Sequence, residues 1–275
     1  MENDPDILAE ATGEALVLQK DAAPPRNIPR DHVPLNVVHG AHRANSSTAA
    51  LLSAAGGLPT LRTFTHGFYD KVFADPHLDK FIRSHDDPHG ERFALWIAEK
   101  MGHGSPWTEE RSTRPVCPFH IRGVGTIDVH DRSSAHFAAW HSPKRDPADF
   151  GKHFKLDDCR VWMRLHFWAA REAGIFEGEK AAFGDYYVRF IGHFVSVYEN
   201  SAPMFARESM RWSADPANIA RYRSEKTYPA KMPGVLGVGL RQAAHADLPE
   251  HERVYTGSRG DDPSWPYELG RRSGR

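Results

Sequence analysis

Residues 60–82 read TLRTFTHGFYDKVFADPHLDKFI and decide the expected architecture of the chain. Four apolar residues recur there at the three-to-four spacing of one helix face: Leu61, Phe64, Phe68 and Val72. This spacing predicts an α-helix over 60–73. The dipeptide Asp75-Pro76 ends that helix and favours a short second one over 78–82.

The same spacing continues on the C-terminal side. After Asp87-Pro88, an acidic cap followed by proline, a helix is expected up to the stop at Gly102 and Gly104. Three more helices are predicted over about 131–142, 157–174 and 179–200. No segment alternates convincingly at period two, so the fold class is all-α, with about six helices.

Composition divides the chain into three parts. Residues 1–56 are rich in Pro, Asp, Ser and Ala and are expected to form a loose N-terminal arm. Residues 57–216 hold the periodic segments and are expected to be the domain. Residues 217–275 carry few aliphatic side chains and are expected to be an extended tail. Within the domain, the proline- and glycine-rich stretch 105–130 predicts a long loop.

Charge and composition exclude several classes of function. The formal net charge is −1, which gives no basic face for nucleic acid. No apolar run approaches the roughly 18 residues that a membrane span needs. The acidic N-terminus and the two cysteines, Cys117 and Cys159, favour a cytoplasmic protein. The 17 histidines direct attention to metal ligation, because imidazole is the commonest metal ligand in proteins.

The order of these segments resembles the truncated haemoglobins, most closely group II. Four features carry the resemblance: FYDKVFADPHLDKFI (68–82), HGERFALWIAEKMGHGSPW (89–107), a histidine-bearing helix after a loop, and Trp162 in LDDCRVWM (156–163). The first two look like the family's first long helix and its distal helix. Trp162 matches the tryptophan that group II members place against the haem. Two departures are the turn at 102–106 and the longer loop before the proximal helix.

The resemblance implies a globin-like helical sandwich, here with a long insertion and extended tails, that holds haem b. It implies reversible binding of dioxygen or other diatomic ligands, as in oxygen transport. With electrons from an unidentified reductase, it also implies oxidation of nitric oxide to nitrate or peroxidase-like turnover, because the sequence contains no flavin or nicotinamide module of its own. A homo-oligomer stays open.

The iron of such a haem needs an axial ligand, usually a neutral imidazole. His136 is favoured because it lies in the middle of a predicted helix, among small alanines that let a flat ring approach. His141, at the end of the same helix, and His153, just before Phe154, are the alternatives.

On the distal side, Tyr69 corresponds to the family's distal tyrosine, whose hydroxyl can donate to a bound ligand. His89, Phe93 and Trp96 follow helical spacing on the same face. Trp96 and Trp162 carry indole N–H donors. The remaining apolar pocket residues are expected to be Phe68, Ile97 and Phe81, with Ile82 as the alternative to Phe81 at the haem edge.

Cations are expected at the rim, where they would pair with the haem propionates. Arginine matches a carboxylate with two parallel hydrogen bonds. The candidates are Arg92, Arg111, Lys144 and Arg145, of which the last two follow the proximal helix directly.

Two other functions compete with haem binding. His85–Asp87 and His130–Asp131 could belong to a metal phosphohydrolase of the HD type, in which paired His and Asp bind metals that activate water. A globin-like domain without haem, acting as a sensor or interaction module, is the other alternative.

Overall fold

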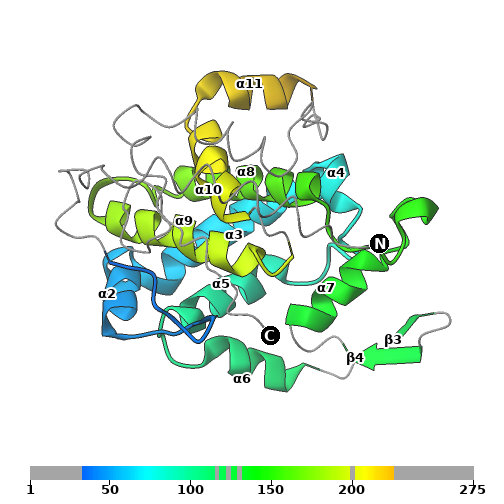
Figure 1. Cartoon of the computed structure of the whole chain (residues 1–275), viewed down its shortest axis with the longest axis horizontal. Helices are drawn as coiled ribbons and strands as arrows, with labels where there is room; N and C mark the ends of the chain where they lie inside the picture. Colours follow the sequence, from blue (N-terminus) through cyan, green and yellow to red (C-terminus); the bar gives the residue numbers. More distant parts are fainter. Residues whose placement is uncertain (1–32, 115–117, 122–124, 129–131, 199–201, 226–275) are drawn as a thin grey trace, which may run out of the picture.

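The computed structural model describes residues 33–114, 118–121, 125–128, 132–198 and 202–225, and these are mostly helical (Figure 1). The helices are α2 (Ser46–Ala54), α3 (Gly57–Ala74), α4 (Pro76–Asp79), α5 (His89–Lys100), α6 (Pro106–Thr113), α7 (Arg132–Trp140), α8 (Leu156–Glu172), α9 (Ala181–Val195), α10 (Ala202–Trp212) and α11 (Pro216–Glu225). Short 3₁₀ turns are η1 (Pro147–Asp149) and η2 (Gly178–Lys180), and the strands are β1 (Val37–Val38), β2 (Ala41–His42), β3 (Pro118–Ile121) and β4 (Gly125–Asp128).

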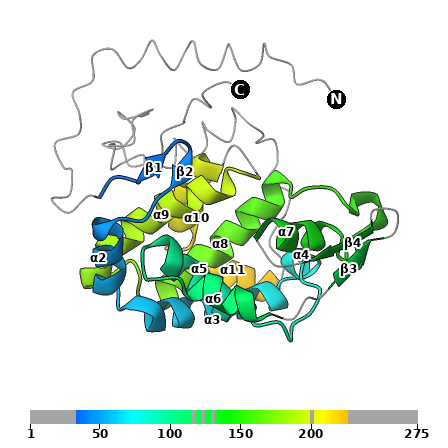
Figure 2. The same cartoon turned by 90° about the horizontal axis from the view of Figure 1, so that it is seen from below.

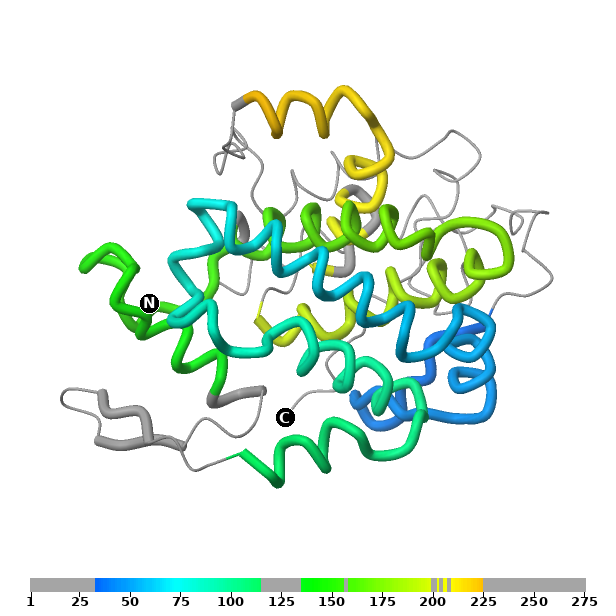
Figure 3. The backbone as a smooth tube through the Cα atoms, turned by 180° about the vertical axis from the view of Figure 1, so that it is seen from behind, coloured from blue at the N-terminus to red at the C-terminus, as the bar shows by residue number. Residues whose placement is uncertain are grey.

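The long helices pack as a bundle. Helix α3 contacts both α5 and α8, and α10 contacts both α8 and α9. Figures 1 and 3 show α11 and α6 at opposite edges of this bundle. Figures 1 and 2 both place α7 beside the bundle, next to the β3–β4 hairpin. The all-α prediction is therefore confirmed for the described residues.

The predicted break at Asp75-Pro76 lies between α3 and α4, where the sequence places it. The Asp75 carboxylate accepts hydrogen bonds from the backbone N–H groups of His77 (2.8 Å) and Leu78 (2.9 Å), which starts α4. Its second oxygen accepts a 2.5 Å hydrogen bond from the Tyr222 hydroxyl on α11. One buried carboxylate thus joins α4 to a helix nearly 150 residues further along the chain.

Two predicted helix ends differ from those observed. Helix α5 begins at His89, with Pro88 before its first turn, because Asp87 bonds to the Arg92 side chain (3.3 Å) and does not cap the helix. The helix predicted to run to residue 200 ends at Val195, and the separate helix α10 follows it.

The prediction of a loose arm and an extended tail is wrong for the segments next to the domain. Within 33–56 the chain forms the β1–β2 hairpin and α2, whose capping box joins Asn45 to Thr48. Leu51 and Leu52 of α2 are buried in the core. In the predicted tail, α11 places Ile219 and Tyr222 against the core. The rest of both segments lies outside the described residues.

The predicted loop over 105–130 also contains regular structure. Pro106 occupies the first turn of α6, where a missing N–H costs no hydrogen bond. Strands β3 and β4 then pair antiparallel, with Phe119 opposite Ile127. Each strand has only four residues, too few for a clear alternating pattern in the sequence.

His42 ties the N-terminal hairpin to α9. Its Nε2 shares a 2.7 Å hydrogen bond with the Tyr186 hydroxyl, and its ring packs edge-on against Phe190. Burial, with smaller contributions from nearby His193 and Lys100, lowers the pKa of His42 from 6.5 to about 4. The imidazole is therefore neutral in the folded protein at pH 7.

We expect the free energy of unfolding to fall as the pH drops from 6.5 to about 4. In this window the unfolded chain binds a proton at His42 and the folded chain does not, so stability rises with pH. His42→Gln should flatten the dependence, although His89 and His166, whose pKa values burial also lowers, keep part of it. Urea unfolding at several pH values measures this. With the exposed His103→Gln as control, equal slopes for wild type and His42→Gln would refute the assignment.

Candidate functional site

A cavity of about 590 Å³ lies among α3, the α4 region, α5, α7, α8 and α9. Its size is within the range of small-molecule and cofactor sites. Most of its walls are aromatic or aliphatic, and they include these residues singled out from the sequence: Tyr69, Phe81, Ile82, His89, Phe93, Trp96, His136 and Trp162. Residues far apart in the chain thus meet around one space.

His136 faces this cavity from α7. Its Nδ1 shares a 2.5 Å hydrogen bond with the Tyr198 hydroxyl, and its ring lies edge-on to Tyr198 and Phe154. Tyr198 and Phe154 also line the cavity. A hydrogen bond at one ring nitrogen fixes the orientation of an imidazole. The bond to Tyr198 therefore holds the His136 ring in one position at the cavity wall.

The two alternative proximal histidines do not line the cavity. His141 bonds through Nδ1 to the Phe137 carbonyl oxygen (2.8 Å) and lies against Gly151. His153 is exposed and stacks on Trp140 with ring centres 4.1 Å apart. Of the three candidates, the structure brings His136 alone to the aromatic space.

Tyr69 presents its hydroxyl in an apolar setting. Burial raises the pKa of Tyr69 to about 12, so the phenol keeps its proton. Its ring stacks on His89, with centres 5.2 Å apart. Among the described residues, no hydrogen-bond acceptor pairs with this hydroxyl. It remains available as a donor to a ligand in the cavity.

His89 is held by the turn that precedes its own helix. Its Nε2 lies 3.0 Å from the carbonyl oxygen of Ser84 and therefore donates to it. Burial lowers the pKa of His89, which keeps the ring neutral. The stack on Tyr69 and the bond to Ser84 fix the imidazole at the cavity wall.

Two tryptophans and a phenylalanine form the facing walls. Phe93 stacks on Trp96 (5.8 Å) and lies tilted against Trp162 (6.0 Å). Trp162 in turn stacks on His166 (4.4 Å). The indole N–H of Trp162 has no hydrogen-bond partner among the residues that the structure describes. It is a second unpaired donor in the same cavity.

Phe68, Ile97, Lys144 and Arg145 were predicted to line the pocket but lie elsewhere. Phe68 and Ile97 are fully buried in the core behind the cavity, where Phe68 packs edge-on against Trp162. Lys144 pairs with Asp79 at 3.1 Å. Arg145 donates to two backbone carbonyl oxygens, those of Trp140 and Lys152. The prediction was wrong for Phe68 and Ile97 because the apolar faces of their helices continue into the core. It was wrong for Lys144 and Arg145 because nearby oxygen acceptors bind their side chains.

The basic side chains that do line the cavity are Arg83, Arg92 and Arg114. Arg92 was predicted, and its Nε donates to Glu110 at 3.2 Å. Arg114 pairs with the same Glu110. Arg111 instead lies over the ring of Trp107. Arg83 and Arg114 were missed because they lie in segments without helical periodicity.

The residues proposed for a hydrolase do not form a metal site in the described structure. His85 stacks on Phe73 and pairs with Asp79 at 2.5 Å, while Asp87 pairs with Arg92. In the described ranges, no three His, Cys, Asp or Glu side chains gather as metal ligands would. His130 and Asp131 lie outside those ranges.

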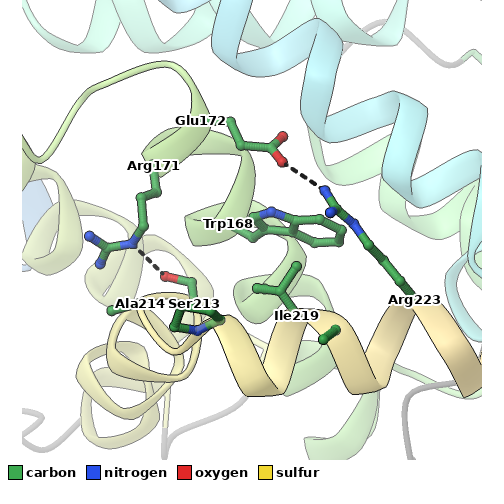
Figure 4. A pocket seen from close by; sticks show the side chains of 9 residues that line it. Trp168, Arg171, Glu172, Ser213, Ala214, Ile219 and Arg223 are labelled. Carbon is green, nitrogen blue, oxygen red and sulfur yellow. Dashed lines mark hydrogen bonds and ion pairs between the residues drawn. The ribbon is translucent and has the colours of Figure 1, made fainter.

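A second pocket, of about 420 Å³, lies between the end of α8 and α11 (Figure 4). Its charged groups have partners: Arg171 Nε donates to the Ser213 hydroxyl at 3.5 Å, and Arg223 forms an ion pair with Glu172 at 3.6 Å. The aromatic cavity differs because two of its donors, Tyr69 and Trp162, have no such partner in the part of the chain that the structure describes. We therefore take the aromatic cavity as the candidate site.

No family model, curated protein or solved structure matches the chain. Within the described residues, the helices are too short or too polar to cross a membrane. The functional argument therefore depends on the cavity and the groups that line it.

Proposed function

We propose that the aromatic cavity binds haem b and that the chain is a globin-type protein that binds dioxygen reversibly. One observation carries this proposal. The imidazole of His136, oriented by Tyr198, lines the same largely apolar space as Tyr69 and Trp162, two donors without hydrogen-bond partners among the described residues.

The chemistry of the lining fits a haem. A flat macrocycle needs aromatic and aliphatic walls, which Phe81, Phe93 and Trp96 supply. Its two carboxylates need cations, and Arg92 and Arg114 lie at the same cavity. These arginines share Glu110, so they are already held in place by an ion pair.

His136 would be the axial ligand, and Tyr198 would fix its ring through Nδ1. When bound, the haem would supply reversible binding of dioxygen or another diatomic molecule. The protein's own part is to hold the imidazole, to exclude water with aromatic side chains, and to provide hydrogen-bond donors to the ligand.

Tyr69 and Trp162 would provide those donors. Dioxygen takes up partial negative charge when it binds, so donors stabilise it more than they stabilise carbon monoxide. Because the pKa of Tyr69 is raised, the hydroxyl stays protonated and donates across the physiological pH range. Neutral His89, stacked on Tyr69, holds the phenol ring in position. Nitric oxide oxidation and peroxidase-like turnover would use the same donors and need an external reductase.

Titration of the full-length protein with haemin tests this proposal. We expect saturation at one haemin per chain, read from quenching of tryptophan fluorescence, because Trp96 and Trp162 line the cavity. Ala138→Trp should weaken binding at least about tenfold, because Ala138 is buried at the cavity wall and a larger side chain fills the space. Ala148→Trp, at an exposed position in η1, is the matched control. Equal binding by both variants would place haemin elsewhere, and no binding would leave the haem-free alternative.

A further inference from the structure

His166 is a histidine where packing alone would favour an aliphatic residue. It lies on α8, one turn after Trp162, and none of it is exposed. The rings of Phe64 and Phe68 meet it edge-on, at 4.7 and 4.9 Å. Burying a polar ring among phenylalanines costs free energy that a leucine would not cost. The buried imidazole therefore needs a polar interaction that offsets this cost.

Two contacts fix the position of the His166 ring. The Nε2 of His166 shares a 2.9 Å hydrogen bond with the Tyr187 hydroxyl on α9. The face of the same ring stacks on the Trp162 indole, with centres 4.4 Å apart and planes 19° apart. The other nitrogen, Nδ1, has no hydrogen-bond partner among the described residues. The ring is thus anchored at one atom and covers Trp162 with its face.

We propose that His166 is a positioning residue, anchored by Tyr187, that holds the Trp162 indole in one orientation at the cavity wall. The part of this inference that concerns the bound ligand rests on the proposed haem function. The other part, that the Trp162 indole has a single orientation, applies to the haem-free protein and does not depend on that function.

The other neighbours of Trp162 do not replace this stack. Phe68 meets the indole edge-on, with planes 78° apart, and Phe93 lies tilted at 56°. Both contacts limit the space around the indole, but a parallel face defines the plane of the ring. Burial also lowers the pKa of His166 and raises that of Tyr187, so the anchor joins two neutral groups and does not change with pH near neutrality.

An oriented indole matters because its N–H donates along one direction only. A donor that is already fixed loses little conformational freedom when a ligand arrives, whereas a rotating donor loses more. His166 therefore acts on the ligand through Trp162 and does not itself line the cavity.

Fluorine NMR of haem-free protein labelled with 5-fluorotryptophan tests the positioning directly. Trp162→Phe identifies the Trp162 resonance by its loss. We expect one narrow line in the wild type and a broadened or split line in His166→Leu. Tyr187→Phe, which keeps the ring and removes only the hydroxyl, should act in the same direction. The fully buried Phe205→Leu, on α10, should leave the line unchanged.

A double-mutant cycle separates anchoring from packing. His166→Phe keeps an aromatic face but cannot bond to Tyr187, so the double variant with Tyr187→Phe should disturb the Trp162 line no more than either single variant. Additive disturbance would mean that the two residues act independently and would overturn the proposal. An unchanged line in both Tyr187→Phe and His166→Phe would overturn it as well.

In the haem-loaded protein, the His166 and Tyr187 variants should speed dioxygen dissociation by about three- to tenfold, less than full loss of a hydrogen bond, because the Trp162 donor is kept but no longer held in one orientation. If haemin does not bind, the proposed function fails, while the fluorine spectra still decide the role of His166. If haemin binds and the Trp162 line does not respond, the positioning role alone fails.

Discussion

Replacing His136 by alanine is expected to weaken haem binding at least about 100-fold. Loss of a residue that only hydrogen-bonds to a metal ligand already lowers metal affinity by about 10- to 100-fold, so loss of the ligand itself should cost at least as much. His136 lies at the cavity and is oriented by Tyr198. The variant should still fold, because the side chain is only half-buried and alanine favours helix α7. Haem transfer to apomyoglobin measures the loss rate, and circular dichroism checks the fold.

His141→Ala and His153→Ala are the matched controls, because both histidines neighbour the cavity without lining it. Each should retain haem as the wild type does. Imidazole added to His136→Gly should restore binding by replacing the missing ring. Retention of haem by His136→Ala, with loss in either control, would move the axial ligand to that control's histidine.

Tyr69→Phe is expected to speed dioxygen dissociation by about 5- to 150-fold, which corresponds to the roughly 1–3 kcal/mol of a hydrogen bond in a dry pocket. Carbon monoxide dissociation should change much less, because that ligand carries little negative charge. The phenol ring itself is retained, so its stack on His89 stays in place. Stopped-flow mixing of the oxygenated protein with carbon monoxide measures the dissociation rate.

Tyr222→Phe is the control for Tyr69→Phe, because it also removes one hydroxyl but does so at Asp75, outside the cavity. Its dioxygen dissociation should match that of the wild type. An unchanged rate in Tyr69→Phe would remove this residue from the distal role and leave Trp162 as the remaining unpaired donor.

Helical spacing and the Asp-Pro break predicted the elements with strong apolar stripes. Helix α3 was expected over 60–73 and is observed over Gly57–Ala74. Helix α2 was missed because its alanines and serines carry little periodic signal, and it is held by Leu51 and Leu52 after the chain has folded. Helix α6 was missed because its sequence, with Pro106 and several polar residues, reads as a loop.

The candidate site was predictable where local spacing sufficed. His89, Phe93 and Trp96 follow helical spacing on α5, and all three line the cavity. Tyr69, on the neighbouring α3, also lines it, but it was assigned from the family resemblance and not from spacing. The supporting groups were not predictable in the same way. Tyr198 lies 62 residues from its partner His136.

The pair formed by His166 and Tyr187 shows the same limit, because it joins separate helices at 21 residues' distance. Apolar spacing identifies which face of each helix is buried. It does not identify which polar atoms meet there after the helices pack.

The absorption spectrum of the full-length protein, mixed with one equivalent of haemin, tests the central claim most directly. We predict an intense Soret band that sharpens on reduction and shifts when carbon monoxide is added, as a haem with one imidazole ligand requires. A spectrum identical to that of free haemin in buffer, in the ferric, ferrous and carbon monoxide forms, would contradict the claim.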